Sequence, residues 1–510
     1  MKRIFAALLL FILCAPGTAR AQQVPFLSEL FSRYEEFNKL YTAKRSAGAN
    51  LAAIEPLRKR GEEAFRRGDI PGIIELIGES TALLQGKPWD EKQRFIASLA
   101  LEADRMVIEP NAVLQVSLTR IFPTSIEKAY PAAPTVTFEI AVAEPPSSAK
   151  SSAPVAVQPL VIAERVPIAI TSSNSARRLL VADGVYWIIA RVEAGGKQIA
   201  SLRLPVYAIS NFSGSIAQMS QTIAAIKHSP DPKVQTLAPL IATPEFQLQR
   251  LASLNQSRSE VETNPAQELD KIEAELAALA SGQNPFSNER GEVERAYQAA
   301  DGKLVPYRLY IPKSYDGAGL KPLVVMLHGA LGDEGYYFSG LFDPAVIKGE
   351  AERRGWILAG VNGRGRLSGY LGPGTDDTFE VVKCVTRDYR IDASRIYLTG
   401  HSMGGFGVWL IAAARPELFA AIAPVSGGAP IKGDALNSLL QKVKALPVMV
   451  VHGGRDGINP PQLSREMTSA AQKAGLKVSY LEVPDADHLN ILAGTFPPIL
   501  DFFEKQTKAK

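Results

Sequence analysis

The sequence predicts a chain of several domains that ends in an α/β domain with an eight-stranded, mostly parallel sheet, preceded by a helical bundle and a small β-sandwich-like segment. Two observations carry the prediction for the last domain. From residue 292 onward, short apolar runs alternate with amphipathic segments, which is typical of a parallel sheet covered by helices on both faces. Within this region one strand-to-helix turn reads Gly400-His-Ser-Met-Gly404, a pattern that lifts a serine hydroxyl out of the top of such a sheet. The length of 510 residues leaves room for roughly two to four domains.

The N-terminus has the three regions of a secretory signal peptide. Basic residues at positions 2 and 3 precede an apolar run from Ile4 to Leu13, and small residues surround the position after which cleavage is expected, Ala21. Regions of this kind in this order predict a signal peptide over residues 1–21. The apolar run is too short to stay in a bilayer as a permanent anchor. We therefore expect a periplasmic or secreted protein.

Charge and cysteine content argue against several classes of protein. The formal net charge is +4, and loss of Lys2, Arg3 and Arg20 with the signal peptide brings the mature chain close to neutrality. This balance favours neither nucleic acid nor an anionic membrane surface as a partner. Of the two cysteines, Cys14 leaves with the signal peptide, so Cys384 cannot form an internal disulfide and is expected to be a buried apolar residue.

Three segments are predicted between the signal peptide and the last domain. Apolar residues recur every three or four positions through 22–108, which predicts a helical bundle whose last helix runs from Phe95 to Met106. Alternation of period two over 109–210 predicts a β-sandwich-like region, which could bind a glycan or a partner or act only as a spacer. Helical periodicity returns over 211–290, a helical connector and linker whose polar end marks the main domain boundary.

The last domain, residues 291–510, is predicted to begin with a hairpin and to continue as alternating strands and helices. The hairpin strands are expected at Val293–Ala299 and Leu304–Ile311, joined by a two-residue turn at Asp301-Gly302. The later strands are expected at 323–328, 356–361, 395–401, 419–425, 447–452 and 477–483, and the helices at 343–354, 376–389, 403–414, 434–445, 460–474 and 489–506.

The turn around Ser402 predicts a strained and exposed serine. In the Gly-x-Ser-x-Gly pattern, the sharp turn from strand to helix strains the serine backbone and projects its hydroxyl. Glycine is needed at 400 and 404 because a side chain there would collide with the neighbouring strand or helix, and Gly405 relieves the same crowding. The first turn of the helix also directs free N–H groups and the positive end of the helix dipole toward whatever Ser402 attacks. The alternative is an ordinary turn whose serine only caps the helix.

Two further residues follow strands of the same sheet in a suitable order. Asp456 and His488 each come after a predicted strand, and the order Ser, Asp, His is that of the α/β-hydrolase triad. In this assignment Ser402 is the nucleophile, His488 takes and returns its proton, and Asp456 orients the imidazole. The alternatives are a structural role for His488 and, for the acid, Asp485 or Asp487, which lie close to it in the sequence.

The small number of histidines limits the choice of base. The chain has five, of which His228 lies outside the last domain. His328 and His401 adjoin other motifs, and His452 ends a strand, where packing is the expected role.

A tetrahedral intermediate at Ser402 would need hydrogen-bond donors for its oxyanion. The turn His328-Gly-Ala330 closes the third strand, where such folds place one main-chain donor, and Met403 supplies a second donor at the helix start. We expect the amides of Ala330 and Met403 to form the oxyanion hole. Losing one such donor costs roughly 3–4 kcal/mol in comparable enzymes.

Three stretches of the last domain resemble a known group of proteins. They are Leu327–Glu334, Asp392–Gly405 and Phe419–Gly427, which read LHGALGDE, DASRIYLTGHSMGG and FAAIAPVSG. Together they resemble secreted α/β-hydrolases of the esterase and polyhydroxybutyrate-depolymerase-like group, and also the catalytic domains of prolyl-oligopeptidase-type peptidases. The resemblance covers about 292–507 and implies an α/β-hydrolase domain with serine hydrolase chemistry.

The same resemblance bears on substrate binding. The loop 363–374 is similar to a substrate-side loop in such proteins, in which Arg364 or Arg366 could meet a substrate carboxylate, with a solvated loop arginine as the alternative. Prolyl-oligopeptidase-type enzymes usually carry a β-propeller ahead of the hydrolase, and this chain shows no repeated blade pattern, which places esterase ahead of peptidase. Strand-to-helix connections are short and leave no obvious inserted lid, so an open cleft for soluble or polymeric esters is expected.

The first functional hypothesis is a serine hydrolase that cleaves carboxylic esters through an acyl-enzyme intermediate, with acetyl or feruloyl esters on plant polysaccharide, or a polyester, as substrates. One alternative is a serine peptidase of prolyl-oligopeptidase type. Another is a cell-surface binding protein with a remnant hydrolase fold, against which the intact serine, histidine and aspartate argue. No cofactor or metal is expected, because no phosphate-cradling loop and no metal-ligand spacing are present. The expected partner is a small-molecule or polymeric ester, or a peptide, without nucleic acid or stable membrane insertion; the oligomeric state is left open.

Overall fold

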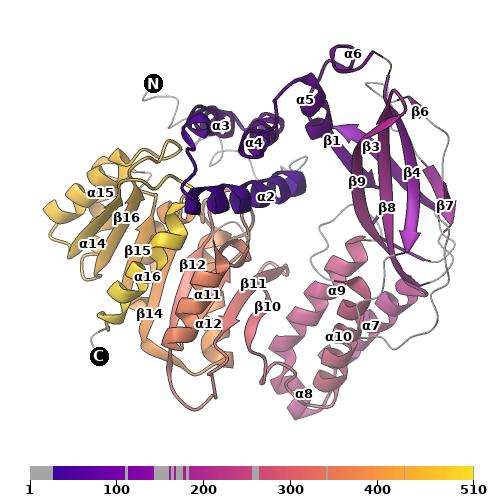
Figure 1. Cartoon of the computed structure of the whole chain (residues 1–510). Coiled ribbons are helices and arrows are strands. Elements are labelled where there is room, and N and C mark those ends of the chain that lie inside the picture. Colours follow the sequence, from indigo (N-terminus) through magenta and orange to yellow (C-terminus); the bar gives the residue numbers. More distant parts are fainter. Residues whose placement is uncertain are drawn as a thin grey trace. The chain divides into compact units, whose positions relative to one another are not determined.

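The computed structural model describes residues 27–109, 113–131, 133–142, 160–161, 166–167, 176–179, 183–254, 264–339, 343–429 and 431–508. The chain divides into two compact units, residues 23–283 and residues 284–510, drawn from indigo to pink and from pink to yellow in Figure 1. The predicted signal peptide, residues 1–21, lies outside the described residues. The three segments predicted between residues 22 and 290 fall almost entirely in the first unit, and their independence as domains stays a prediction.

The first unit begins with helices whose ends are marked in the sequence. They are α2 (Leu27–Ser46), α3 (Glu55–Arg67), α4 (Ile70–Leu84) and α5 (Glu91–Ser98). Gly68 ends α3 in the left-handed conformation, with φ +69°. The carboxylates of Asp69 and Asp90 cap α4 and α5 by accepting from main-chain amides of the first turn.

The predicted helix from Phe95 to Met106 is wrong over its second half. Helix α5 ends at Ser98, and Leu99–Ala103 form strand β1. This strand pairs antiparallel with β3 (Val113–Arg120), and its apolar side chains enter the core of the β region. Pairing with a distant strand has overridden a helical period in the local sequence.

Two sheets follow, as the alternating pattern predicts. One has the order β1-β3-β7, with β7 at Ala176–Leu179, and the other has the order β2-β9-β8-β4-β5, with β6 beside β4. A single buried cluster contains Leu101 and Leu118 from the first sheet and Phe138 and Ile188 from the second, so the two sheets share one core. The strands of the second sheet are β2 (Val107–Ile108), β4 (Thr135–Val142), β5 (Leu160–Val161), β6 (Val166–Pro167), β8 (Gly184–Ala194) and β9 (Lys197–Ala208), and the short helix α6 covers Ile126–Ala129.

Helices close the first unit. They are α7 (Phe212–Lys227), α8 (Pro232–Thr236), α9 (Ala242–Leu254) and α10 (Pro265–Ala280), and α10 packs against α7 and α9. Its buried face contains Leu269, Ile272, Leu276 and Leu279, the face that the periodicity predicts. Nowhere in the described residues is there a helix with the length and apolar content needed to cross a bilayer.

The second unit is built on one eight-stranded sheet, as predicted. Its order is β10-β11-β13-β12-β14-β15-β16-β17. Strands β10 and β11 are antiparallel to their neighbours, whereas β13 to β17 run parallel with β12. The strands are β10 (Gly291–Gln298), β11 (Leu304–Ile311), β12 (Lys321–Leu327), β13 (Ile357–Val361), β14 (Ile391–His401), β15 (Ala421–Val425), β16 (Val448–Gly453) and β17 (Val478–Val483).

Helices cover both faces of this sheet (Figure 1). Side chains of β12 alternate between two apolar clusters, with Leu323 and Val325 in one and Val324 and Met326 in the other. The first cluster includes α12, α13, α14 and α15, and the second includes α11 and α16, so each set of helices covers one face. The helices are α11 (Pro344–Arg354), α12 (Pro373–Asp388), α13 (Met403–Ala414), α14 (Gly433–Lys442), α15 (Gln462–Lys473) and α16 (Ile491–Glu504).

Two details of the second unit can be compared with the sequence. Cys384 is buried in the first of these clusters, as expected, and burial raises the pKa of its thiol to about 11.

The predicted two-residue hairpin turn is wrong. Ala299 N–H donates to Lys303 O at 2.8 Å, so the loop between β10 and β11 has three residues, with Gly302 in the left-handed conformation. A glycine at that position lets the longer loop close the hairpin without strain.

Candidate active site

The turn between β14 and α13 holds Ser402 in a strained backbone conformation. Its φ and ψ are 55° and −114°, a region that residues other than glycine rarely occupy. The Ser402 N–H donates to Val425 O at 2.9 Å, and its carbonyl accepts from the Phe406 N–H at 3.1 Å. The turn is therefore bound both to the neighbouring strand and to the helix that follows. The serine side chain remains available for other contacts.

Three glycines make this turn possible. A Cβ atom on Gly404 would lie 2.1 Å from Leu327 O, and one on Gly405 would lie 2.4 Å from Val425 O. A Cβ on Gly400 would lie 2.5 Å from the Gly404 carbonyl oxygen. The atoms in the way are main-chain atoms of the sheet and of the helix, which cannot move aside separately. The collisions predicted from the sequence therefore have a direct structural basis.

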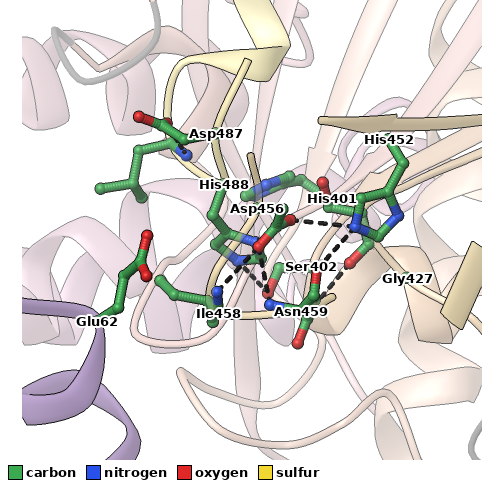
Figure 2. Close-up of polar contacts among 12 residues, drawn as sticks. Glu62, His401, Ser402, Gly427, His452, Asp456, Ile458, Asn459, Asp487 and His488 are labelled. Carbon is green, nitrogen blue, oxygen red and sulfur yellow. Dashed lines mark hydrogen bonds and ion pairs between the residues drawn. The ribbon is translucent and has the colours of Figure 1, made fainter. Parts of the chain in front are cut away.

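The structure brings together the three residues of the predicted triad (Figure 2). His488 Nε2 lies 2.8 Å from Ser402 Oγ, and His488 Nδ1 lies 2.7 Å from Asp456 Oδ2. All three residues are buried, with exposed fractions of 8% for the serine, 4% for the histidine and 3% for the aspartate. They come from the ends of three different strands or the loops after them, so a chain of hydrogen bonds from carboxylate to imidazole to hydroxyl exists at one edge of the sheet.

The carboxylate of Asp456 is held by four donors. Its Oδ1 accepts from the amides of Ile458 and Asn459 at 3.0 and 2.8 Å. Its Oδ2 faces two imidazoles, His488 Nδ1 and His452 Nε2, the latter at 3.2 Å. Burial by itself would raise the pKa of Asp456, but the charge of His488 and the hydrogen bond from His452 hold that pKa below its ordinary value. The carboxyl group is therefore ionised at neutral pH.

The two rival carboxylates have other partners. Asp485 forms an ion pair with Arg455 at 2.6 Å. Asp487 Oδ1 accepts from the amides of Leu489 and Asn490, each at 2.9 Å, and so shapes the turn before α16. Closeness in sequence to the histidine thus does not bring either carboxylate to its ring nitrogen.

The turn after β12 is adjacent to the start of α13. A Cβ on Gly404 would lie within 2.8 Å of His328 O, which shows how closely the two segments approach. In this turn Leu331 N–H donates to Arg366 O at 2.7 Å, and Gly332 N–H donates to Gly329 O. Among the described residues, the amides of Ala330 and Met403 have no main-chain acceptor. Their role as donors to an oxyanion stays a prediction.

The two loop arginines are bound within the domain. Arg364 Nε contacts both carboxylate oxygens of Asp377 at 2.8 and 2.9 Å, and its Nη1 contacts Asp301 at 2.7 Å. Arg366 Nη1 donates to Leu331 O at 2.9 Å. Neither is the solvated loop arginine considered as the alternative. The expected contact of Arg364 or Arg366 with a substrate carboxylate stays a prediction, and two carboxylates of the protein contact the Arg364 guanidinium.

Arg366, unlike Arg364, binds residues of the turn after β12. Besides its bond to Leu331 O, its Nη2 lies 3.2 Å from Asp333 Oδ2. Its carbonyl also accepts from Leu331, so side chain and main chain together bracket that residue, whose φ is +69°. Arg366 thus supports the turn that contains Ala330.

Two further histidines lie beside the triad. His401 Nδ1 is 2.8 Å from the Tyr336 hydroxyl, and its ring centre is 4.7 Å from that of His488. Burial and the neighbouring His488 hold the pKa of His401 well below its ordinary value, so it is neutral. His452 contacts Asp456, as described above. The sequence analysis missed both contacts. The only signal in the sequence was position: His401 lies one residue before Ser402, and His452 lies four residues before Asp456.

Throughout the described parts of the chain, no group of three or more histidine, cysteine, aspartate or glutamate side chains has an arrangement that could hold a metal ion. The two imidazoles beside Asp456 each contact its carboxylate oxygen Oδ2.

Comparisons with known proteins agree with this geometry. Residues 372–438, which include the turn at Ser402, match the model of the prolyl oligopeptidase family. The chain is 24% identical over 243 residues to a bifunctional acetylxylan esterase/xylanase of Neocallimastix patriciarum, covering 46% of this chain and 34% of that protein. It is 33% identical over 130 residues to feruloyl esterase B of Neurospora crassa, covering 23% of this chain and 42% of that protein.

The extent of these matches is limited. The chain spans less than half the length of the curated relatives that it matches here. Among solved structures, a thermostable esterase aligns with 81% of this chain and 100% of its own, at 15% identity and a TM-score of 0.37. With the eight-stranded sheet and the turn at Ser402, the second unit has the α/β-hydrolase fold, and its sequence matches are to the prolyl oligopeptidase family and to esterases.

Proposed function

We propose that this protein is a serine hydrolase that cleaves carboxylic esters through an acyl-enzyme intermediate. The observation that carries the proposal is the chain of hydrogen bonds from Asp456 through His488 to Ser402, with donor–acceptor distances of 2.7 and 2.8 Å. A serine hydroxyl is a weak nucleophile at neutral pH, and a hydrogen-bonded imidazole supplies the base that it needs. The ionised Asp456 gives the imidazole the required tautomer, with its proton on Nδ1.

The reaction then has two halves. Ser402 Oγ attacks the ester carbonyl while His488 Nε2 takes the hydroxyl proton, and the tetrahedral intermediate carries a negative oxygen. As this intermediate collapses, His488 returns the proton to the departing alcohol and the acyl group stays on Ser402. Water then attacks the acyl-enzyme with the same histidine as base, which releases the acid and restores the serine.

We assign the amides of Ala330 and Met403 as the hydrogen-bond donors to the oxyanion of both tetrahedral intermediates. The Met403 amide opens α13, where main-chain donors point away from the helix and the dipole is positive. The turn containing Ala330 is held by Arg366 and by the close approach of β12 to the helix start. Donors fixed in this way stabilise developing charge without having to reorganise during the reaction.

The substrates are proposed to be acetyl or feruloyl esters on plant polysaccharide, or a polyester. The similarity to an acetylxylan esterase and to a feruloyl esterase supports the first two. The two arginines of the loop over 363–374 are bound to residues of the domain, so a charged acyl group would have to compete with these partners. A neutral acyl group is therefore favoured over one that carries a carboxylate.

Labelling by a fluorophosphonate probe tests the nucleophile. Wild-type protein is expected to be labelled and to hydrolyse 4-nitrophenyl acetate, whereas the variant Ser402→Ala is expected to do neither. Ser426→Ala is a matched control, since Ser426 also has a positive φ at the end of the neighbouring strand, and its buried hydroxyl has no hydrogen-bond partner among the described residues. Absence of labelling in folded wild-type protein would overturn the proposal and favour a binding protein with a remnant hydrolase fold.

A serine peptidase is the second candidate. It is favoured by the match of residues 372–438 to the prolyl oligopeptidase family. This segment contains the serine turn, which esterases and peptidases of this fold share, so the match does not separate the two classes. Initial rates on a feruloyl or acetyl ester and on a peptide amide of proline separate them. Faster turnover of the amide would replace the esterase proposal by the peptidase.

Secretion is proposed from the sequence alone. The basic, apolar and small residues of positions 1–21 support export to the periplasm or the medium. N-terminal sequencing of the protein recovered from each cell fraction tests this. A mature protein that begins at Gln22 and lies outside the cytoplasm is expected, and an uncleaved cytoplasmic protein would contradict it.

A further inference from the structure

We propose that His452 is a positioning residue that holds the carboxylate of Asp456 in the one orientation that serves His488. The inference deepens the proposed function and rests on it. His452 is the penultimate residue of β16 and is fully buried. Its Nε2 lies 2.8 Å from Asn459 O and 3.2 Å from Asp456 Oδ2. Both neighbours are acceptors, so Nε2 carries a hydrogen and donates.

The other ring nitrogen is held from the opposite side. His452 Nδ1 lies 2.6 Å from Ser464 Oγ on α15, and Ser464 Oγ lies 3.3 Å from Gly427 O. The imidazole is thus bound at both ends, between a helix and the loop that carries Asp456. Since a side chain bound at both ends has little rotational freedom, its Nε2–H is fixed in direction.

The fixed donor changes what the carboxylate can do. Oδ2 of Asp456 receives hydrogen bonds from two imidazoles, and Oδ1 receives them from the amides of Ile458 and Asn459. If the carboxylate plane turned away from His488, all four contacts would lengthen together. The orientation of the carboxylate toward His488 is therefore fixed by the ring of His452 as well as by the loop.

The same contacts connect the acid loop to the serine turn. Asn459, whose carbonyl accepts from His452, donates through its side chain to Ser426 O at 2.7 Å. The next residue, Gly427, packs against Gly405 of α13, where an added Cβ would lie 3.2 Å from its Cα. Displacement of the His452 ring would thus disturb both the acid and the floor of the nucleophile turn.

His401 and Glu482 are further titratable side chains near His452 and Asp456. His401, at the end of β14, has its ring centre 4.7 Å from that of His488 and is neutral, as described above. Glu482 on β17 is in register with His452, and its carboxylate is paired with Arg465 at 2.5 Å. Among the described residues, Asp456 is the carboxylate that His452 Nε2 contacts directly.

The loss of this donor has a predicted signature. Without it the negative charge of Asp456 is less well neutralised, so His488 binds a proton more readily. The acidic limb of kcat/KM, which reports loss of the free base, should move to higher pH. Since His452 and Asp456 are buried, KM should change little and kcat should fall.

Two substitutions of similar size separate the donor from the volume of the ring. The amide nitrogen of glutamine can occupy the place of Nε2, whereas that of asparagine occupies the place of Nδ1. His452→Gln is expected to retain near wild-type kcat and pH profile. His452→Asn is expected to lose roughly tenfold in kcat, the scale of a hydrogen bond to a charged group, with the acidic limb moved to higher pH.

The measurement is the pH dependence of kcat/KM and kcat for hydrolysis of a 4-nitrophenyl ester by the full chain, with thermal unfolding of each variant. Equal losses in both variants without a shift of the limb would show a purely structural histidine and overturn the proposal, as would two variants identical to wild type. If neither variant folds, Ser464→Ala, which frees the far end of the ring, must show the same direction of change. Wild-type protein without esterase activity would instead refute the proposed function.

Discussion

The substitution Asp456→Asn is expected to remove almost all activity and leave the fold intact. In the structure, one carboxylate oxygen accepts from the amides of Ile458 and Asn459, and the other accepts from His488 and His452. An asparagine can keep the first set with its oxygen. Its NH₂ group then faces two ring nitrogens that both need an acceptor, so the tautomer of His488 must change.

The magnitude follows from that tautomer. With the proton moved to Nε2, His488 cannot accept the hydrogen of Ser402 Oγ, which lies 2.8 Å away. The same change in another serine hydrolase triad lowers kcat about 10⁴-fold. At about 1.36 kcal/mol for each factor of ten, this is about 5 kcal/mol of lost transition-state stabilisation.

The assay is the initial rate of hydrolysis of 4-nitrophenyl acetate by purified full-length protein, with thermal unfolding to show that the variant is folded. Asp485→Asn is the matched control. This residue is a rival acid by sequence, and it is paired with Arg455 at the surface instead of with the imidazole. Its substitution is expected to change the rate less than about twofold, since exposed ion pairs contribute little.

Two results would refute this reasoning. Folded Asp456→Asn protein that keeps a third or more of the wild-type kcat would show that the aspartate does not set the tautomer. A loss of the same size in Asp485→Asn would show that the acid had been wrongly assigned.

Three further predictions concern the support of the site. Gly404→Ala should destabilise the hydrolase unit by more than about 3 kcal/mol in thermal unfolding, because its Cβ would lie 2.1 Å from Leu327 O. Burial and the nearby charge of Asp333 raise the pKa of Glu334 from 4.5 to about 7, so its stabilising effect is complete below about pH 4.5 and is lost as the pH rises through 7. Glu334→Gln should therefore flatten the dependence of Tm on pH over that range. Arg366→Gln should lower kcat roughly tenfold with KM unchanged, since the turn that contains Ala330 loses a charge-assisted hydrogen bond.

Controls for these changes come from the same domain. Gly349→Ala, on an exposed face of α11 with open space around it, should be neutral or stabilising by up to about 1 kcal/mol. Arg353→Gln, which removes an exposed pair with Glu350, should leave kcat within about twofold. Parallel Tm curves for wild type and Glu334→Gln, or a rise in KM instead of a fall in kcat for Arg366→Gln, would contradict the respective argument.

Much of the hydrolase unit could be predicted because its signals are local. Buried strands of a parallel sheet are continuous apolar runs, and the helices between them have one apolar face, so both can be recognised within a short window. The turn at Ser402 is recognised from a short pattern of residues, although Leu327 O and Val425 O, which require Gly404 and Gly405, belong to neighbouring strands. The order of strands then placed Asp456 and His488 at one edge of the sheet.

Errors arose where distant partners decided the outcome. The segment Leu99–Ala103 has a helical period in its local sequence, but pairing with β3 gives it a place in a sheet and buries its apolar side chains. The carboxylates of Asp377 and Asp301 contact the Arg364 guanidinium, and the local sequence of the loop did not indicate either partner. Charged side chains take the partners that the fold brings near, and no local pattern states which these are.

The residues around the site also divide into those that local sequence determines and those that distant partners determine. By itself the sequence determined which serine is strained, which strands form the sheet and which loops meet at its edge, because backbone geometry and apolar periodicity act over short distances. Tertiary structure decided that His452 donates to Asp456 and that His401 packs beside His488. It also decided that Arg366 binds Leu331 in the turn after β12. These contacts join segments far apart in the chain, and their hydrogen bonds depend on distances and directions that exist only once the sheet is assembled.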